Sequence, residues 1–570
     1  MLQKTANLFT MRRSINYLIL IVLLASCSQK SKLENTQALG GKTYGGSFRF
    51  MSLEKVKYLF PMHSMDIYSQ RINTQIYESL FKETNDNQLV APHLIKSYTK
   101  SDNGLLYTFN LKKGIYFHED PCFEDKTREL TAKDVAFVLQ FACSNSELNH
   151  LSHLLVSKIV GSEEYYRKSS NSISGIRIID SHRFSIALTQ PFTNFEKLLS
   201  HPSLGMFPEE ALKKYGDNIL THPIGTGPFI LDKMTSNGIS LNRNNRYWRK
   251  DKFGNSLPFL SRIEMKYGKD KNSELQAFQN NEIDIILNVP TENVTNLFGS
   301  LNEAQKGKNQ KHKVYSRKSP RINYLAFSTQ NKPFDDILVR KSFLSAIDPK
   351  QVTNDILMGE GTPATSGFIP EINGYISDTN YLIEYNPQRA RSLLAQAGYP
   401  SGNGFPQLTL WVNTLSGTST NLWTQNIAEQ LKNNLGIDVN IKLCSFIERQ
   451  NAIKKGEALF WKTGWIADYP DPESFVSIFY QKYSKLNPYW GNISCLNKNF
   501  DSTFAAYSLE KNQEKRNEFL NKCNQYIMEE AIIIPIYFED LFVVYNLKIR
   551  DFTVNSIETI DLSSVYIKAL

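Results

Sequence analysis

Hydrophobic and polar positions follow two periods along this chain, one of two residues and one near 3.6. Residues 45–50 and 182–191 alternate as half-buried strands do. Residues 70–81 place apolar side chains at helical spacing, and residues 105–117 alternate and then turn at Gly114, as a hairpin does. Short strands mixed with helical segments predict an α/β fold.

Two further helices carry boundary signals in the sequence. Residues 130–143 open with Thr131 as a candidate N-cap, and Asp134 follows three residues later as a variant of the capping box. A second helix is predicted to begin at Asn386, before a proline, and to close at Gly398, with a strand after it.

The N-terminus has the pattern of a secretory leader. Residues 1–26 hold three cations and no acid, and they contain an apolar run too short for a membrane span of about 20 residues. Residues 24–27, Leu-Ala-Ser-Cys, resemble a bacterial lipobox, in which Cys27 becomes the lipid-bearing first residue. An ordinary signal peptide with an accidental cysteine is the alternative. Residues 27–43 are predicted to be a polar tether, and Met11 is an alternative start.

Composition narrows the class of protein. A chain of 570 residues that is 41% hydrophobic and 12% aromatic can form two or three domains. The net charge of +9 is spread thinly, so we expect no nucleic-acid partner. The cysteines after the leader are isolated, which disfavours a zinc site and leaves one or two disulfides open without fixing their pairing. These cysteines are Cys122, Cys143, Cys444, Cys495 and Cys523.

No motif in the chain predicts catalysis, a metal or a cofactor. The sequence holds no GxSxG elbow and no HExxH helix. Gly225 and Gly227 in "PIGTGPF" look like part of a phosphate loop, but no Gly-Lys-Ser or Gly-Lys-Thr follows, so a tight turn before a strand is predicted. His118 has no neighbours at metal-ligand spacing and is predicted to be a solvated loop histidine.

Several segments occur in an order that resembles the family 5 extracellular solute-binding proteins, the dipeptide- and oligopeptide-binding subunits of ABC importers. They include "IYESLF", "LTAKDVAFVL", "HPIGTGPFIL", "LNRNNRYW", "YNPQRARSLLAQAGYPSGNGFP" and "GWIADYPDPESF". The blocks "PIGTGPF" and "ADYPDP" are the most specific of them. The resemblance runs from about residue 44 to the C-terminus, with a departure at residues 117–120, where "FHED" stands in place of the frequent "FHDG".

The resemblance implies a two-lobed α/β protein with the periplasmic-binding-protein type II fold and an extra domain. The chain is expected to cross between the lobes twice, near 290–320 and 530–540, and to close around a ligand about this hinge. The implied segments are 44–63, 170–290 and 536–570 for lobe I, 64–169 for the extra domain and 291–535 for lobe II.

The motif at residues 461–475 supplies the candidate ligand site. An extended strand over Lys462–Ala467 can pair with a peptide backbone by β-augmentation, which reads no side chains. In peptide-binding members of the family the aspartate of this motif binds the α-ammonium, and it matches Asp468. Such a contact near 4 Å is worth about 4 kcal/mol at an effective dielectric constant of about 20, and desolvation offsets much of that. A turn role is the alternative for Asp468, and it is the one predicted for Asp471 and Glu473.

The remaining candidate residues follow from the same strand and from the opposite wall. Thr463, Gly464, Trp465, Ile466 and Ala467 are candidates for ligand contact. For Trp465, the sequence favours a place in the wall of the cleft and a place in the core equally. Lys462 matches a basic residue that meets the ligand's carboxylate in oligopeptide-binding relatives, and a solvated surface lysine is the alternative. Residues 64–69 are a candidate facing strand, with Ile67 as its best-placed residue.

The function implied by the resemblance is peptide capture for import. The protein is expected to be a monomeric, lipid-anchored periplasmic subunit that hands peptides to an ABC permease, with ATP hydrolysis by separate subunits. The alternatives are the same fold binding a metal chelate, haem or an oligosaccharide, and a sensor lipoprotein with another partner. An enzyme is not expected.

Overall fold

The computed structural model describes residues 36–568, with gaps at 65, 85–88, 288, 290–311, 358–360, 373, 379–383, 414–416 and 485–497. The predicted leader, Cys27 and Cys495 lie outside this part of the chain. Within it, no helix has both the length and the apolar character needed to cross a membrane.

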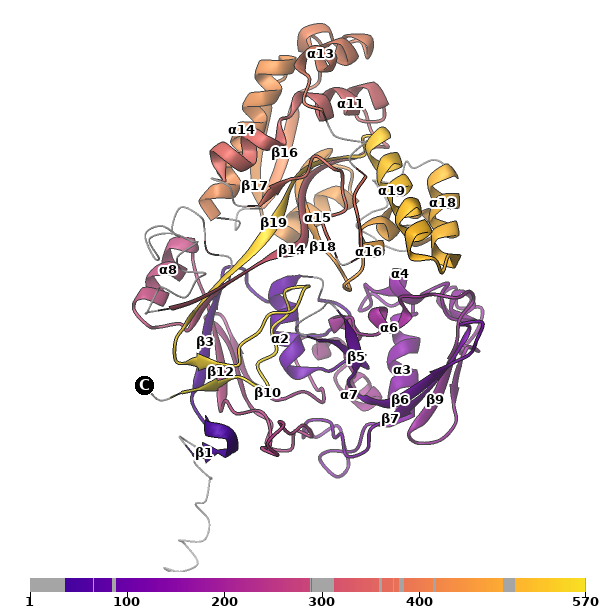
Figure 1. Cartoon of the computed structure of the whole chain (residues 1–570), viewed down its shortest axis with the longest axis vertical. Helices are drawn as coiled ribbons and strands as arrows, with labels where there is room; N and C mark the ends of the chain where they lie inside the picture. Colours follow the sequence, from indigo (N-terminus) through magenta and orange to yellow (C-terminus); the bar gives the residue numbers. More distant parts are fainter. Residues whose placement is uncertain are drawn as a thin grey trace, which may run out of the picture.

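Three sheets organise the molecule (Figure 1). The first has the strand order β10-β11-β12-β3, and its strands are β3 (Ser47–Ser52), β10 (Phe229–Thr235), β11 (Gly238–Arg243) and β12 (Arg262–Tyr267). The second is antiparallel with the order β6-β7-β9-β8, from β6 (Ile95–Lys100), β7 (Leu106–Leu111), β8 (Ile176–Ile178) and β9 (Arg183–Ala187).

The third sheet is the largest and has the order β13-β19-β14-β18-β16-β17, with β15 paired to β19. Its strands are β13 (Ile285–Leu287), β14 (His312–Phe327), β15 (Thr362–Pro363), β16 (Leu408–Asn413), β17 (Val439–Cys444), β18 (Phe460–Ile466) and β19 (Ile533–Asn546). Three strand pairs complete the set: β1 (Gln37–Ala38) with β2 (Lys42–Thr43), β4 (Phe81–Glu83) with β5 (Val90–Pro92), and β20 (Ile549–Arg550) with β21 (Tyr566–Ile567).

Helices cover these sheets. The helices before β14 are α2 (Ile67–Ile76), α3 (Ala132–Ala142), α4 (Ser152–Leu155), α5 (Ser162–Tyr166), α6 (Phe195–Leu198), α7 (Glu209–Tyr215) and α8 (Lys271–Gln279). Those after it are α11 (Ile337–Ala346), α12 (Pro349–Gln351), α13 (Pro387–Gln396), α14 (Gly417–Leu435), α15 (Phe446–Lys454), α16 (Glu473–Val476), α17 (Gln481–Ser484), α18 (Lys498–Leu509) and α19 (Gln513–Glu529).

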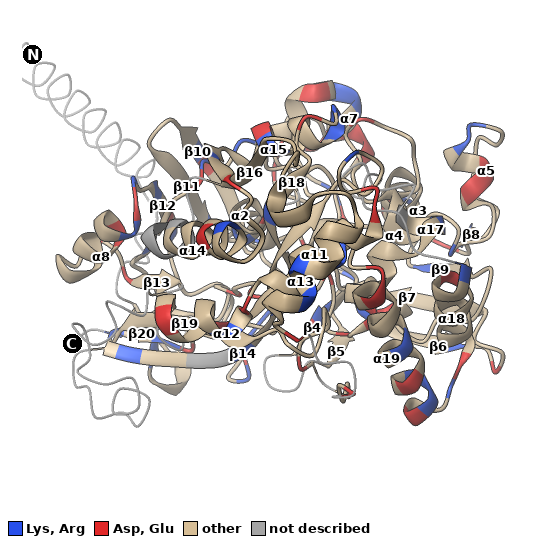
Figure 2. Ribbon diagram, turned by 90° about the horizontal axis from the view of Figure 1, so that it is seen from above, with Lys and Arg blue, Asp and Glu red and all other residues tan. Residues whose placement is uncertain are grey.

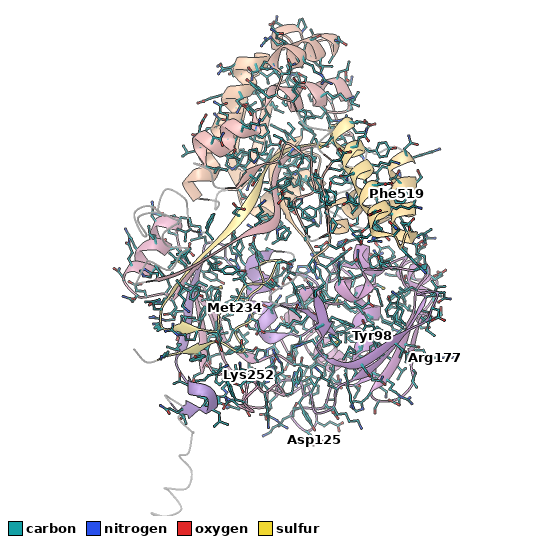
Figure 3. The ribbon with its side chains drawn as sticks, in the orientation of Figure 1. Tyr98, Asp125, Arg177, Met234, Lys252 and Phe519 are labelled. Atoms are coloured by element: carbon teal, nitrogen blue, oxygen red, sulfur yellow. The ribbon has the colours of Figure 1, made fainter. Side chains whose placement is uncertain are left out.

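Two bodies meet across the centre of the molecule. In Figure 1 the lower body holds the first two sheets and the C-terminal strands β20 and β21, and the upper body holds β16, β17, β18 and the helices α11 to α19. The long antiparallel strands β14 and β19 run from one body to the other. The two predicted crossings fall on or beside these strands. Three residues labelled in Figure 3 locate these parts. Met234 lies on β10 of the first sheet, Tyr98 on β6 of the second sheet, and Phe519 on α19 of the upper body.

The core of the upper body explains why the end of β14, residues 322–327, is mostly apolar. Ile322, Tyr324 and Ala326 pack in one buried cluster with side chains of α18 and α19. Leu325 and Phe327 pack in a second cluster on the other face, with side chains of α11, α13 and α14. Alternate residues of a strand point to opposite faces, so a sheet covered by helices on both sides needs apolar residues at consecutive positions.

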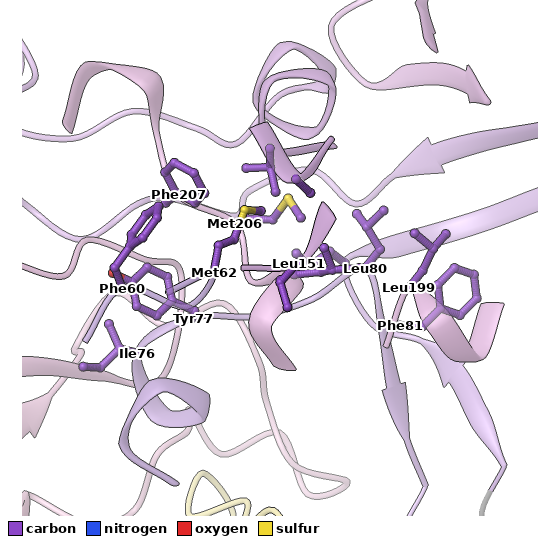
Figure 4. Packing of buried hydrophobic residues seen from close by; sticks show 14 of the residues in the cluster. Phe60, Met62, Ile76, Tyr77, Leu80, Phe81, Leu151, Leu199, Met206 and Phe207 are labelled. Carbon is purple, nitrogen blue, oxygen red and sulfur yellow. The ribbon is translucent and has the colours of Figure 1, made fainter. Parts of the chain in front are cut away.

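One large buried cluster connects the two sheets of the lower body. A single buried cluster includes Phe48 of β3, Phe109 of β7 and Leu139 of α3, so the first and second sheets share it. Figure 4 shows part of this cluster, with Phe60 beside Phe207. The second sheet combines residues 95–111 with residues 176–187, so it spans the predicted domain boundary at 169.

Most of the predicted elements are confirmed. Strand β3 (Ser47–Ser52) overlaps the predicted range 45–50, and β9 (Arg183–Ala187) lies within the predicted range 182–191. Helix α3 has the full capping box of Thr131 and Asp134. The side chain of Asn386 accepts a hydrogen bond from Arg389 N at the start of α13, and β16 follows that helix. The prediction of a hairpin over residues 105–117 is wrong. Strand β7 pairs with β6 on one edge and with β9 on the other, so no edge is left for a hairpin partner.

The turn at "PIGTGPF" is confirmed, and its glycines are required because they pack closely against another backbone segment. A Cβ on Gly225 would lie 2.1 Å from the carbonyl oxygen of Ile76, and one on Gly227 would lie 2.6 Å from it. Gly227 N also donates to Ile76 O at 2.8 Å, so the turn is bound to the C-terminal end of α2. Strand β10 begins directly after it.

The prediction for His118 is wrong. Its side chain is 3% exposed, and its Nε2 lies 2.9 Å from the carbonyl oxygen of Gly227. Burial lowers the pKa of this imidazole to about 4. The prediction failed because the residues that cover His118 are more than 100 positions away in the sequence. The four cysteines described, Cys122, Cys143, Cys444 and Cys523, are free thiols.

Candidate ligand-binding cleft

A cavity of about 940 Å³ lies between the two bodies. Residues from the segments 51–58, 63–64, 66–71 and 267–274 contribute to the wall from the lower body. Residues of β14, β18, β19 and α15 form the opposite wall. A cavity of this size can hold a small solute such as a short peptide.

Strand β18 presents half of its backbone to this cavity. It pairs with β14 along its whole length, from Phe327↔Phe460 to Arg321↔Ile466. Its parallel pairing with β16 covers only Phe460 and Trp461. The edge of β18 beyond Trp461 is therefore not covered by a described strand.

The hydrogen-bond alternation shows which groups face the open edge. Ala467 N donates to Pro320 O at 3.1 Å, so residues 463, 465 and 467 direct their backbone groups toward β14. Residues 462, 464 and 466 direct theirs to the open edge. Lys462 O accepts from Arg449 there, at 2.5 Å. The open edge can pair with an extended backbone.

The structure brings most of the predicted site residues to one place. Those that line the cavity are Lys462, Thr463, Gly464, Trp465, Ile466 and Ile67. The indole of Trp465 also packs against the upper core and donates from Nε1 to Ser474 O at 3.1 Å. Ala467 is buried, at 2% exposure, and neither it nor Asp468 lines this cavity.

The prediction that residues 64–69 form a facing strand is wrong. Asp66 is the N-cap of α2, and its side chain accepts from Ser69 N at 2.7 Å. Ile67 is the first residue of that helix, so it reaches the cavity from a helix N-terminus. The local signal for this helix start is Asp66 itself, because aspartate is a preferred N-cap residue.

Asp468 lies at a second, much smaller cavity where the bodies touch. This cavity is also lined by His153, Lys158 and Tyr483. The Asp468 carboxylate is 17% exposed, and its Oδ1 lies 3.6 Å from Nε2 of His201. Its backbone N–H donates to the Ser474 hydroxyl at 2.8 Å, which fixes the turn after β18.

The acids after Asp468 form a polar contact with the lower body. Asp471 Oδ2 lies 2.6 Å from Lys197 Nζ. Glu473 accepts from Asn194 Nδ2 at 3.1 Å and from Tyr469 O–H at 2.8 Å, and burial raises its pKa. Asp471 also accepts from Glu473 N at 3.0 Å, which is the predicted turn role. Both carboxylates therefore contribute to the contact between the bodies as well as to the turn.

Lys158 belongs to the same contact. Its side chain is 7% exposed, and its Nζ lies 3.7 Å from the ring centroid of Tyr483 in the upper body. Burial lowers the pKa of this ammonium to about 8. On the outer side, Lys482 Nζ lies 3.0 Å from Glu163 Oε1.

An ion network connects the bodies at the other end of the cleft. Arg321 of β14 donates to Glu539 Oε1 at 3.1 Å and to Glu558 Oε2 at 2.5 Å. Arg71 of α2 lies 3.9 Å from the same Glu558 oxygen, and Asn323 donates to Glu539 at 2.9 Å. These partners keep Arg321 and Glu539 in fixed orientations at the cavity wall.

Several contributors to this region could not be identified from the sequence. His201, Lys197 and Glu558 carry no motif, and each meets a residue more than 200 positions away in the sequence. Arg449 also carries no motif that predicts its contacts with Asn413 and Lys462. In the described residues, no group of three or more His, Cys, Asp or Glu side chains is arranged to hold a metal ion. Outside the cleft both signs of charge are interspersed, as on α7 and α19 in Figure 2.

The family follows from comparison with known proteins. The profile described as "Bacterial extracellular solute-binding proteins, family 5 Middle" matches residues 90–487, which is more than half of the chain. The chain is a family 5 bacterial extracellular solute-binding protein. It is therefore a binding protein and not an enzyme.

Relatives of this solute-binding protein differ in what their names say they bind. The "Glutathione-binding protein GsiB" of Salmonella typhimurium is 26% identical over 501 residues, 87% of this chain and 89% of the relative. The "Heme-binding protein A" of Haemophilus influenzae is 26% identical over 533 residues, 90% and 91% of the two chains.

Solved structures confirm the two-lobed α/β fold. The binding protein DppA from Helicobacter pylori, in complex with the peptide STSA, gives a TM-score of 0.79 at 22% identity and covers 92% of this chain and 99% of its own. The dipeptide binding protein from Pseudoalteromonas sp. SM9913, in complex with Met-Leu, gives 0.77 at 19% identity, with 92% and 100% covered.

Proposed function

We propose that this solute-binding protein captures short peptides outside the inner membrane and delivers them to an ABC permease. The observation that carries the proposal is the open edge of β18 inside a cavity of about 940 Å³. A backbone edge pairs with any extended peptide, whatever its side chains. The structural neighbours crystallised with peptides support this choice of solute.

Asp468 is the proposed partner of the peptide's α-ammonium. It stands two residues beyond the end of β18, so an extended peptide on the open edge directs one terminus toward it. Its present partner is His201, at 3.6 Å. An arriving ammonium takes the place of this imidazole. The ion pair then fixes the register and direction of the peptide more than it adds affinity, because desolvation offsets most of its energy.

The other candidate residues are assigned roles according to their positions on β18 and on the opposite wall of the cleft. Gly464 and Ile466 are proposed to offer backbone groups at the open edge, and Thr463, Trp465 and Ile67 to form walls against the solute. Ala467, whose N–H donates to Pro320 O, is proposed to fix the end of the strand. Lys462 is proposed to face the carboxylate end. The lobes are proposed to close over the solute about β14 and β19, and the ATPase subunits that drive import are separate chains.

The proposed location is the periplasmic face of a membrane. Cys27 is the proposed lipid-attachment residue, and residues 27–43 are proposed to connect the anchor to the folded body.

Native mass spectrometry of the protein purified without denaturation tests the proposed solute. We expect a family of bound masses that denaturation releases as peptides. A single bound haem, visible by its absorption band, or a bound metal chelate or oligosaccharide would contradict the proposal and favour the alternative suggested by the haem-binding relative.

A further inference from the structure

The N-terminal end of the described chain is folded onto the lower body. Residues 37–43, the later part of the predicted tether, form β1, a short 3-10 turn over Leu39–Gly41, and β2. Leu39 N donates to Asn255 Oδ1 at 2.9 Å, and Asn255 Nδ2 donates to Leu39 O at 3.0 Å. The Thr43 hydroxyl donates to Ile567 O of β21 at 2.5 Å. The chain is therefore fixed to the lower body from about residue 37 onward.

The length of chain before this point limits how far the body can stand from an anchor at Cys27. Eight residues, 28–35, lie between Cys27 and the first described residue. At about 3.4 Å per residue they reach at most roughly 30 Å. A folded body of about 530 residues is roughly 60 Å across. An anchored protein therefore keeps the end of the body that carries β1 near the membrane. In Figure 1 this end is the lower one, on the side away from the upper body.

This end of the body exposes two large apolar side chains. Leu39 is 65% exposed and Phe253 is 41% exposed. They are neighbours, because Phe253 packs against Gly40, where a Cβ would lie 2.5 Å from the ring. The loop that carries Phe253 is held by Asp251, which accepts from the backbone N–H groups of Phe253 and Asn255, both at 2.9 Å. Apolar side chains presented beside cations are typical of surfaces that contact the membrane interface.

Three lysines accompany this apolar pair. Lys250 and Lys252 lie on the same loop as Phe253, and Lys252 Nζ is 5.2 Å from the centroid of its ring. Lys568 follows directly after Ile567, whose carbonyl binds the Thr43 hydroxyl. All three lysines are exposed, and none of them forms an ion pair with a carboxylate among the described residues. Their charge is therefore available to a partner outside the chain.

Two acids beside these lysines pair with a further lysine. Lys42 Nζ lies 2.9 Å from Asp551 Oδ2 and 3.5 Å from Asp251 Oδ2. It also lies 5.0 Å from the ring centroid of Phe259, so this ammonium belongs to the fold and is 11% exposed. Four lysines and two aspartates leave an excess of two positive charges at this end of the body. A surface with this balance is complementary to anionic lipid headgroups.

We propose that Leu39, Lys250, Lys252, Phe253 and Lys568 form a membrane-contact patch that rests on an anionic phospholipid surface. This rests on the proposed function in placing an anchored protein at a membrane. The lysines attract the phosphate headgroups, and Leu39 and Phe253 enter the boundary between headgroups and acyl chains. The patch orients the molecule, so that the lower body stands between the membrane and the cleft. Attachment itself remains with the lipid.

Hydrogen exchange on vesicles tests the patch without relying on the natural lipid. A hexahistidine tag before residue 28 binds a nickel-chelating lipid in place of the anchor, and the chain from residue 28 contains every described element. The vesicles are phosphatidylcholine with or without phosphatidylglycerol. We expect the amides of residues 250–256 to exchange about fivefold more slowly on the anionic vesicles, since each lysine at such a surface gives roughly that factor in binding. High salt should abolish the difference.

Variants separate the patch from a general attraction to anionic lipid. Lys250→Gln combined with Lys252→Gln, and Phe253→Ser alone, are each expected to restore the exchange rate seen on phosphatidylcholine. The matched control combines Lys213→Gln on α7 with Lys432→Gln on α14, whose lysine side chains are 69% and 64% exposed. It removes the same charge elsewhere and is expected to keep the slower exchange. Unchanged exchange in β10 to β12 shows that each variant is folded.

The outcomes distinguish the patch from the proposed function. Equal exchange on the two kinds of vesicle would overturn the patch, and so would slower exchange that survives in both patch variants. Either result leaves peptide capture intact, because peptide binding is measured separately by calorimetry. A natural N-terminus without lipid, seen by mass spectrometry, would contradict the anchor and leave the exchange result unaffected, since the tag replaces the lipid.

Discussion

Asp468 and His201 meet across the contact between the two bodies, with 3.6 Å between Oδ1 and Nε2. Asp468 is the residue that the family resemblance assigns to the ligand's amine, and here it interacts with a side chain of the opposite body. The neighbouring acids Asp471 and Glu473 do the same with Lys197 and Asn194. One short segment after β18 therefore carries both the proposed amine contact and the contacts that join the two bodies.

The ion pair between Lys197 and Asp471 is expected to favour the closed arrangement. Lys197→Met removes a contact of 2.6 Å whose lysine side chain is 29% exposed, so the loss should be about 0.5–1 kcal/mol, or roughly two- to fivefold in peptide affinity. Calorimetry at low and at high salt measures it. We expect the difference from the wild type to shrink as salt is added, because salt screens the pair. A variant that binds as tightly as the wild type at low salt would contradict this.

His118 is expected to make the fold acid-sensitive. The neutral ring donates from Nε2 to Gly227 O, at 2.9 Å, and accepts from Gly225 N at Nδ1, at 3.4 Å. Its pKa is about 4 in the folded protein, whereas an ordinary histidine titrates near 6.5. Below pH 6.5 the unfolded chain therefore binds a proton at this histidine, whereas the folded chain binds it only near pH 4. The free energy of unfolding consequently decreases as the pH falls from 6.5 to about 4.

Urea denaturation across this pH range measures the effect. The lowered pKa of His118 corresponds to roughly 3 kcal/mol of stability lost over the whole window. His118→Gln should reduce the acid-dependent loss by an amount of that order, although it destabilises the fold at neutral pH. His222→Gln, which replaces a histidine with a 47% exposed side chain, is the control. An unchanged pH dependence in His118→Gln would show that the histidine is not the sensitive group.

The sequence predicted those elements whose signals are local. The capping box of Thr131 and Asp134 and the Asn386 N-cap depend on residues within one helical turn, and both formed as predicted. The turn at Gly225 was also predicted, but its reason, contact with Ile76, was not visible in the sequence.

The residues of the cleft could be predicted from the sequence only where a single strand carries them. Residues 462–466 reached the cavity because a single β-strand carries all of them. Ile67 reached it from a helix instead of the predicted strand, because Asp66 caps the first turn of α2. The contact of Asp468 with His201 joins two segments that are distant in the sequence, and no local pattern encodes it.

Pairing with β18 is expected to depend on single backbone N–H groups of the peptide. In an extended ligand alternate N–H groups face β18, so N-methylation at one position should remove a hydrogen bond to the edge at Gly464 or Ile466. The expected loss is about 1–1.5 kcal/mol, close to tenfold in affinity. Methylation of the adjacent nitrogen, which faces away, is the matched control. Equal effects at both positions, measured by competition binding, would argue against strand pairing.

Lipid attachment at Cys27 is expected to hold the protein on a membrane. The variant Cys27→Ala lacks the proposed site of lipid attachment, so the folded body should appear in the soluble periplasmic fraction. Fractionation followed by immunoblotting distinguishes the two forms. Retention of Cys27→Ala in the membrane fraction would exclude the lipid as the anchor.

The amine of the solute is the feature that the account of peptide capture depends on most. Isothermal titration calorimetry should compare one tripeptide with its N-acetylated form, on the wild type and on Asp468→Asn. We expect the acetylated peptide to bind poorly to the wild type, and Asp468→Asn to bind the free peptide about 10- to 100-fold more weakly, about 1.4–2.7 kcal/mol, with little change for the acetylated one. Equal binding of the two peptides to the wild type would contradict the role of Asp468 and with it the proposed mode of capture.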